Sequence, residues 1–253
     1  MLNYLHSQWY RTVRRKYLYI ALAAALALGA LYLYLVRAAI GDRPIGLESG
    51  VEEIVSLTPY VGFYAILLIN DGAFSDERRL GTFKNDISFG FSRGTLYFGK
   101  LINCLVFCVL GMIMLAVPVL GMGVLILGVR DWEIFGIQME LFGRTVLAAF
   151  PLWLCGAAAA NALSCVLRKS VFVVMSYIAA FNLGNLMLQL MARLEPVWEK
   201  IRAHFPMGLL DDLSNGMLLE DGGFMARCWV MGLLFTALFV AAGYFGFRRA
   251  EVK

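Results

Sequence analysis

The stretch from Gly94 to Leu101, GTLYFGKL, comes close to a nucleotide-binding loop, because a glycine, four residues, a second glycine and a lysine follow one another. A Walker-type loop also needs a serine or threonine directly after the lysine to bind the metal ion, and Leu101 stands there. It further needs a buried strand before the loop, whereas RRLGTFKNDISFGFSR is too charged and irregular for one. No complete Walker motif occurs elsewhere in the sequence, so we do not expect the chain to hydrolyse ATP.

Other residues with catalytic or metal-binding potential do not form the pattern of a known catalytic or metal site. Glu52 and Glu53 are paired glutamates of the kind used by CAAX-type intramembrane proteases, but that chemistry needs histidines inside the membrane. The two histidines, His6 and His204, lie outside the apolar segments, and the five cysteines lie inside them, where small packing residues are expected. We therefore predict no catalytic residue, no metal site and no cofactor bound by this chain, which is not expected to be an enzyme.

The composition is that of a membrane protein. Of 253 residues, 60% are hydrophobic and 16% are charged, and the mean hydropathy is +0.72. Six uncharged runs of 17 to 29 residues approach or exceed the roughly 20 helical residues that cross a hydrocarbon layer about 30 Å thick. We predict an all-α integral membrane protein with one transmembrane domain over residues 1–253. Its spans are expected at about 17–36, 52–71, 97–128, 145–167, 170–192 and 228–247.

The distribution of charge predicts an orientation. Most of the 22 Lys and Arg residues lie in the two terminal segments and in the connections after the second and fourth runs. Such residues favour the cytoplasmic side, so both termini are expected there. Basic residues at an anionic membrane face also account for the net charge of +4, and no nucleic-acid partner is expected.

Shorter elements are expected around the spans. Residues 1–16 read either as an amphipathic helix in the membrane interface or as a basic flank of the first span. The third run is long enough that we expect it to tilt or to break near its outer end, with any break at Pro118, Gly121 and Gly123. Residues 193–227 are too apolar for a solvated loop, and two short extracellular half-helices are expected there, before the last span.

The connection between the second and third runs predicts a further helix on the cytoplasmic side. Leu80, Phe83, Ile87 and Phe91 follow a helical spacing over about residues 75–90, with charged residues elsewhere around the helix. Acceptors at Ser75, Asp76 and Glu77 suit its start, and Gly90 and Gly94 suit its end.

Two groups of polar residues lie within the predicted spans. In the fifth, three amides at i, i+3 and i+7 share a helix face, and a semi-polar patch lies in the second. Such side chains either bond to neighbouring helices or face a translocation path, and we expect a path. The residues concerned are Thr58, Tyr60, Tyr64, Asn182, Asn185 and Gln189.

The cytoplasmic connection carries a family resemblance. Glu77, Gly81 and Thr82 form E-x-x-x-G-T, and Ser92, Arg93, Tyr97 and Lys100 form S-R-x-x-x-Y-x-x-K. This motif resembles that of the ABC-2 type permeases, the membrane subunits of ATP-binding-cassette exporters. Gly90 departs from the family, whose members often carry proline two residues before the Ser-Arg pair.

The resemblance implies a function and its partners. In that family this stretch is a coupling helix that docks on a separate ATPase, present in two copies, which binds ATP and Mg. It implies a homodimer in a bacterial plasma membrane that exports an amphipathic or hydrophobic cargo, either a peptide (toxin, bacteriocin or antimicrobial peptide) or a drug. The residues expected at the ATPase are Glu77, Arg78, Arg79, Gly81, Thr82, Lys84, Asp86, Ser92 and Arg93.

Two other functions stay open. One is a membrane immunity or scaffold protein that transports nothing. The other is an ion-coupled secondary transporter, although such proteins use ionisable residues at mid-membrane and often an internal repeat, and the runs here are uncharged.

Overall fold

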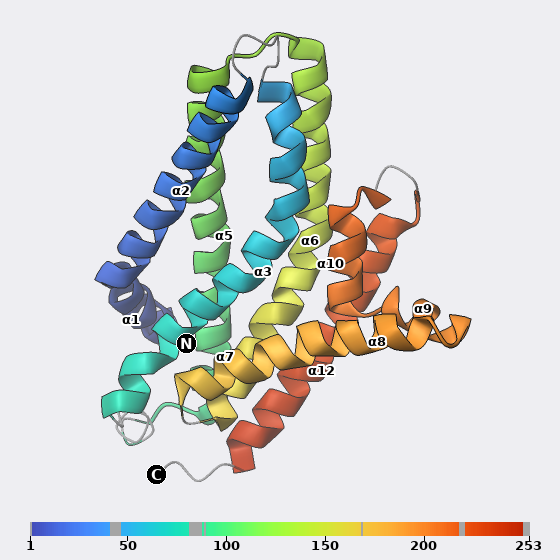
Figure 1. Cartoon of the computed structure of the whole chain (residues 1–253). Helices are drawn as coiled ribbons and strands as arrows, with labels where there is room; N and C mark the ends of the chain where they lie inside the picture. The colour runs from blue at the N-terminus through green and yellow to red at the C-terminus, as the bar shows by residue number, and fades with distance from the viewer. Residues whose placement is uncertain are drawn as a thin grey trace.

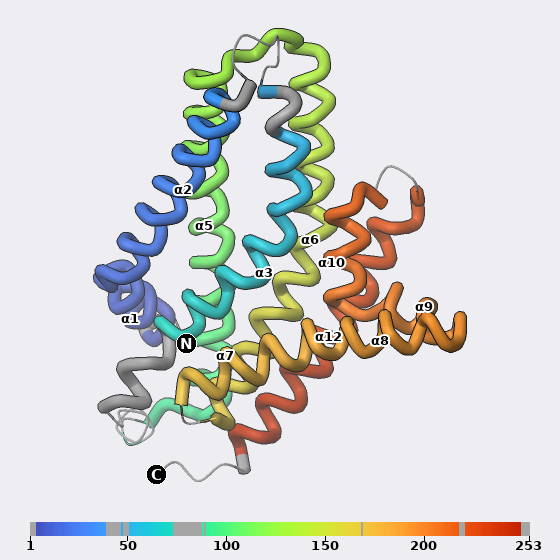
Figure 2. Tube along the Cα trace, in the orientation of Figure 1, coloured from blue at the N-terminus to red at the C-terminus, as the bar shows by residue number. Residues whose placement is uncertain are grey.

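The computed structural model describes the backbone of residues 2–40, 47–80, 88, 90–167, 169–217 and 221–249 (Figure 2). Within these ranges it describes the side chains except those of residues 2, 3, 39, 40, 48–50, 73–80 and 249.

Every regular element in the described part of the chain is a helix, and six segments are long and apolar enough to cross a membrane (Figure 1). This confirms the predicted all-α architecture. The six are α2 (Lys16–Ile40), α3 (Leu47–Leu80), α5 (Arg93–Leu127), α6 (Trp132–Val166), the continuous α7 (Ser170–Ile178), η1 (Ala179–Leu183) and α8 (Gly184–Ala192), and α12 (Phe224–Arg249).

Three shorter helices accompany them: α1 (Leu2–Val13), α9 (Pro196–Arg202) and α10 (Pro206–Ser214). The last two occupy the region where two short helices were expected. Each begins at a proline, which fits the first turn because its missing N–H has no partner there anyway. Apolar side chains of α10 are buried, and α10 packs against α3 and α6.

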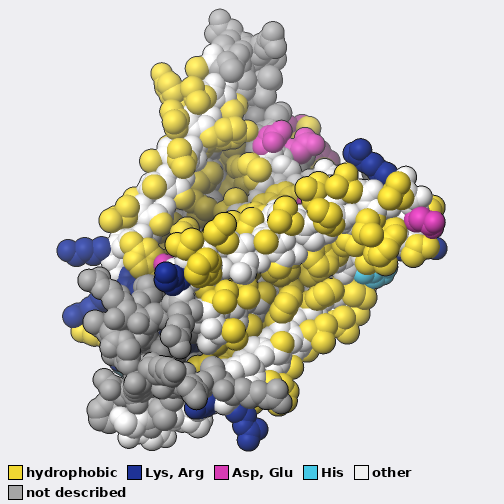
Figure 3. Space-filling view, turned by 60° about the horizontal axis from the view of Figure 1, so that its bottom comes forward, with side chains coloured by type: hydrophobic (Ala, Val, Ile, Leu, Met, Phe, Trp, Pro, Cys, Tyr) yellow, Lys and Arg dark blue, Asp and Glu magenta, His cyan; other side chains and the backbone are white. Residues whose placement is uncertain are grey.

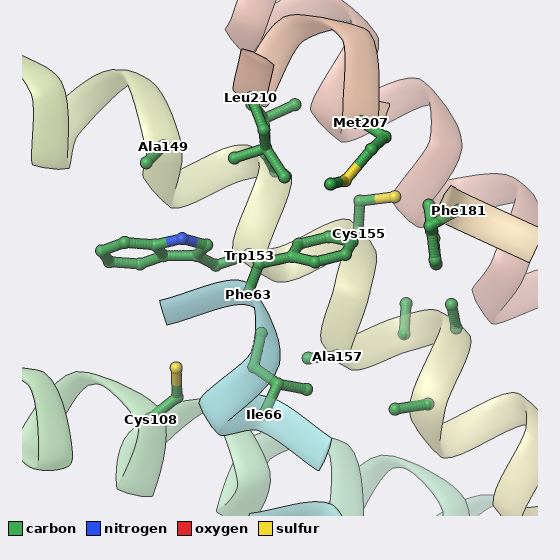
Figure 4. Packing of buried hydrophobic residues seen from close by; sticks show 14 of the residues in the cluster. Phe63, Ile66, Cys108, Ala149, Trp153, Cys155, Ala157, Phe181, Met207 and Leu210 are labelled. Carbon is green, nitrogen blue, oxygen red and sulfur yellow. The ribbon is translucent and has the colours of Figure 1, made fainter. Parts of the chain in front are cut away.

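The core forms around α6, which is mostly buried, whereas few residues of α2 are buried. Phe63 of α3 and Trp153 of α6 lie at its centre, and Met207 and Leu210 of α10 point towards them (Figure 4). The four consecutive alanines at 157–160 are buried and make α6 thin around most of its circumference, so both α3 and α12 can approach it closely. Elsewhere the surface is apolar, with Lys and Arg gathered in a few separate groups in the view of Figure 3, as expected for helices that face lipid.

One end of the molecule extends beyond the rest. The ends of α2 and α5 and the starts of α3 and α6 rise past α10 and the start of α12 (Figure 1). Leu47, Val51 and Val55 form a separate buried cluster there, against Leu127 and Phe135 among others. At 35 residues each, α5 and α6 are about 52 Å long, so they tilt or project beyond a hydrocarbon layer about 30 Å thick.

The sequence predicted a separate helix that begins at about residue 75. In the structure, residues 75–80 instead continue α3. The single Gly72 does not end a helix, and the residues after it include good helix formers. The remainder of the predicted helix, residues 81–87 and 89, lies outside the described residues. Gly90 has φ 87°, the left-handed conformation that favours glycine at a turn. Gly94, which was also expected to end the predicted helix, instead lies in the first turn of α5.

The expected break near Pro118, Gly121 and Gly123 is also wrong, because α5 continues to Leu127. Inside a membrane no water replaces lost backbone hydrogen bonds, so the helix tolerates Pro118 rather than ending there. The helix ends instead at Gly128, φ 73°, whose carbonyl accepts from the Leu47 N–H at 2.9 Å.

The span predicted from residue 145 starts earlier, at Trp132. The Asp131 carboxylate caps α6 by accepting from the backbone N–H groups of Glu133, at 2.9 Å, and Ile134, at 3.1 Å. Glu140 and Arg144 form an ion pair one turn apart at 2.6 Å on an exposed face. These charges interrupted the apolar run without interrupting the helix.

Helix α1 packs through a polar face and keeps its apolar face exposed. Tyr4, Gln8 and Thr12 are buried, and the Asn103 amide of α5 donates to the Thr12 hydroxyl at 2.9 Å. Trp9 is 42% exposed, and its ring packs against that of Phe107 of α5, with the ring centroids 4.8 Å apart. Lys100 of α5 is buried as well, with 1% of its surface exposed.

Candidate functional site

The polar residues of α3 and α8 meet at a carboxylate on α10. Asp211 Oδ1 accepts from the Tyr60 hydroxyl at 2.6 Å, and Asp211 Oδ2 accepts from the side-chain amides of Asn185, at 2.6 Å, and Gln189, at 3.3 Å. We call these four residues the Asp211 cluster. One acidic group thus joins α10 both to α8, which is close to it in sequence, and to α3, which is distant from both.

The charge of Asp211 is held by neutral donors. No described Lys, Arg or His side chain pairs with it. The neighbouring Asp212 contrasts with it, because its carboxylate pairs with Arg202 at 3.0 Å. Arg202 also donates to Glu199, and this hydrogen bond lowers the pKa of the Glu199 carboxyl. Arg202 therefore compensates Asp212 and Glu199, while no described cation pairs with Asp211.

A second polar pair lies beside the cluster. The Tyr64 hydroxyl donates to Asn182 Oδ1 at 2.7 Å, and Asn182 stands in η1, the π-helical turn between α7 and α8. Such turns are frequent at functional sites. Thr58 is not part of either group, because its hydroxyl donates to the Ile54 carbonyl of its own helix at 2.6 Å.

Of the six residues predicted to face a path, the structure therefore gathers three at Asp211 and pairs two beside it. Asp211 itself was not among the residues that the sequence predicted to face a path. The sequence did contain a signal that Asp211 would be held against other helices. Asp211 directly follows Leu209 and Leu210, in a segment that is too apolar for a solvated loop.

An apolar cavity of about 510 Å³ lies between α1, α2, α3 and α5. Trp9, Leu22, Tyr64, Phe107 and Met114 are among the residues that line it. Tyr64 thus belongs to both features: its ring lines the cavity and its hydroxyl donates to Asn182. An amphipathic molecule would find polar and apolar surface on either side of this tyrosine.

The start of α5 is tied to the end of α12. Ser92 caps α5, with its hydroxyl oxygen accepting from the Thr95 N–H at 3.1 Å. The Arg93 guanidinium donates to the carbonyls of Phe247, at 3.1 Å, and Arg248, at 2.5 Å. One turn further, the Asn161 amide of α6 donates to the carbonyl of the buried Tyr97 at 3.4 Å. Arg93, predicted to face a partner, is thus engaged within the chain.

The other residues predicted to contact a partner lie beyond what the structure describes. Glu77, Arg78 and Arg79 belong to the backbone of α3, but their side chains are not described. Gly81, Thr82, Lys84 and Asp86 lie outside the described residues altogether.

Within the described ranges, no group of three or more His, Cys, Asp or Glu residues is placed to hold a metal ion. All five cysteines are free thiols, and four of them, Cys104, Cys108, Cys155 and Cys228, are buried.

No protein-family model matches the chain, and no curated protein matches it in sequence.

Proposed function

We propose that this chain is the membrane-spanning subunit of an ABC-2 type exporter, which couples ATP hydrolysis by a separate ATPase to the export of an amphipathic cargo. The observation that carries the proposal is the motif from Glu77 to Lys100, which begins in the last turns of α3 and ends in the first turns of α5, two long helices of an all-α chain. The chain has no complete Walker motif, so the work of transport would come from a partner.

The contacts of the motif support a mechanical role. Ser92 and Arg93 fix the start of α5 and bind the end of α12, and Tyr97 is packed against α6. A partner that moves the connection between α3 and α5 would therefore displace α3 and α5 directly and α12 through Arg93. Rigid contacts of this kind transmit a displacement that a free loop would absorb.

The cargo path is proposed to lie at the Asp211 cluster and the adjoining cavity. We propose that two copies of the chain form a homodimer whose α3 and α7–α8 helices face each other. Exposed apolar side chains along α7 and α8, such as Phe172, Met175 and Met187, would then face either lipid or the second copy. Both termini are placed on the cytoplasmic side of a bacterial plasma membrane.

Reversing the charges of Arg79 and Lys84 together, by Arg79→Glu and Lys84→Glu, is expected to disrupt docking of the ATPase. Affinity-tagged wild-type chain, solubilised from its native host, should co-purify an ATP-binding-cassette protein in stoichiometric amount. The double variant should recover at least about tenfold less, because like charges placed across an interface repel. The matched control is Arg130→Glu with Arg144→Glu, two exposed residues at the other end of the molecule.

Equal recovery with both double variants would contradict the docking assignment. If the wild-type chain co-purified no ATPase in several mild detergents, the export proposal itself would fail, and an immunity or scaffold role would take its place.

An ion-coupled secondary transporter is the second candidate, and Asp211 favours it. The apolar runs carry no charge, but the fold brings this carboxylate against α3 and α8. Reconstituted vesicles separate the two candidates, since uptake driven by a sodium or proton gradient without ATPase would support the second alone.

A further inference from the structure

We infer that the Asp211 cluster binds the ammonium group of an amphiphilic amine. This inference rests on the proposed function, because it names the chemical class of the exported cargo. Three observations carry it: an uncompensated carboxylate, a buried acceptor beside it, and aromatic and apolar surface next to both.

The first observation is the charge. Asp211 accepts three hydrogen bonds from neutral donors, Tyr60, Asn185 and Gln189, and these stabilise the carboxylate without cancelling its charge. The neighbouring acids show the alternative, because Asp212 and Glu199 share the guanidinium of Arg202. A carboxylate held in this way attracts a cation from outside the described chain.

The second observation is Asn185, which is only 5% exposed. Its amide nitrogen donates to Asp211, while its carbonyl oxygen Oδ1 has no hydrogen-bond partner among the described residues. The amide cannot simply be turned over, because its carbonyl oxygen would then face the carboxylate. A buried acceptor without a donor is costly, so an N–H group supplied by a ligand would satisfy it.

An ammonium group fits both features at once. It carries a positive charge for Asp211 and three N–H donors, one of which would serve Asn185 Oδ1 once the ligand is bound. A metal ion fits less well, because calcium needs six to eight oxygen ligands and the oxygens here already accept hydrogen bonds from Tyr60, Asn185 and Gln189.

The third observation sets the rest of the ligand. Tyr60 and Tyr64 are one helical turn apart on α3, and aromatic rings attract ammonium groups. Tyr64 also lines the apolar cavity of about 510 Å³, which suits an alkyl chain or an apolar side chain. A cationic head group joined to an apolar body is the class of molecule that this surface selects.

The test uses the full chain in nanodiscs of zwitterionic phosphatidylcholine, titrated with decylammonium and followed by isothermal calorimetry. Empty nanodiscs measure partition into lipid, which is subtracted. We expect saturable binding to wild-type chain. Asp211→Asn should weaken it at least about tenfold, since a hydrogen-bonded ion pair is lost. The control Glu195→Gln, an exposed carboxylate without a side-chain capping bond, should change it less than about twofold.

Two further variants distinguish binding from folding. Tyr60→Phe removes a donor to Asp211 and keeps the carboxylate, so affinity should stay within about threefold or increase. Asn185→Ala removes the buried acceptor and should weaken binding; it replaces Asp211→Asn as the decisive variant if the latter does not elute as a single species.

Several results would overturn the inference. These are no saturable binding, equal binding of decanol, which shows an apolar site alone, or displacement of decylammonium by sodium at equal concentration. Equal affinity of wild type and Asp211→Asn would do the same. No ATPase takes part in this titration, so its failure leaves the co-purification result intact, and failed co-purification leaves amine binding measurable.

Discussion

Replacing Gly232 with leucine is expected to separate α12 from α6 and to prevent the chain from folding. A Cβ atom on Gly232 would lie 2.7 Å from the Pro151 carbonyl carbon and 2.8 Å from its oxygen. These are main-chain atoms in the middle of a buried helix, which cannot turn aside as a side chain can. Overpacking a core typically costs about 1–3 kcal/mol, and four extra carbons against a backbone should exceed that range.

The measurement is the yield of monodisperse protein on size exclusion in mild detergent, together with the thermal unfolding midpoint. Gly121→Leu is the matched control. Gly121 lies in a helix, as Gly232 does, but it is exposed, and a Cβ there meets nothing within 4 Å. A Gly232→Leu variant as stable as Gly121→Leu would mean that α12 does not pack on α6 at this point.

The number and type of helices could be predicted from the sequence, because the hydrocarbon layer sets a length that apolar runs must meet. The residues at which the helices begin and end could not be predicted in the same way. Arg144 and Glu140 lie just before the fourth apolar run, so the sequence placed the start of that span after them. In the structure they pair on the surface of α6, and the helix runs through them without a break. Pro118 and its neighbouring glycines predicted a break by rules for helices in water, and within an apolar helix no solvent competes for the backbone.

The candidate site was predicted in part for a similar reason. Spacing alone placed Asn185 and Gln189 on one face, and both donate to Asp211. The same spacing placed Asn182 with them, but the π-helical turn shifts the phase of the helix, and Asn182 meets Tyr64 instead. Asp211 was missed because its role depends on α10 packing against α3, a contact between residues about 150 positions apart that no local pattern encodes.

Replacing Trp153 with alanine is expected to lower the free energy of unfolding by about 3–5 kcal/mol, the usual cost of emptying a large aromatic site. Trp153 is 3% exposed, and its indole N–H donates to the Pro59 carbonyl of α3 at 2.9 Å. Its ring lies so close to Gly62 that a Cβ there would be 2.3 Å from the indole. The indole therefore fills the space between α3 and α6 and also satisfies a carbonyl in the kink-prone turn around Pro59.

Denaturant titration of Trp153→Ala and Trp153→Phe separates these two contributions. Phenylalanine keeps most of the packing and loses the hydrogen bond, which should cost about 0.5–1.5 kcal/mol for the bond alone. Trp132→Ala is the control, because Trp132 is 69% exposed and should change the stability by less than about 0.5 kcal/mol. If Trp153→Ala matched this control, the α3–α6 contact would not depend on the indole. Because Tyr60 directly follows Pro59, a loosened turn should also weaken the Tyr60–Asp211 hydrogen bond. Since the carboxylate itself stays in place, Trp153→Phe should leave amine affinity within about threefold, as Tyr60→Phe should.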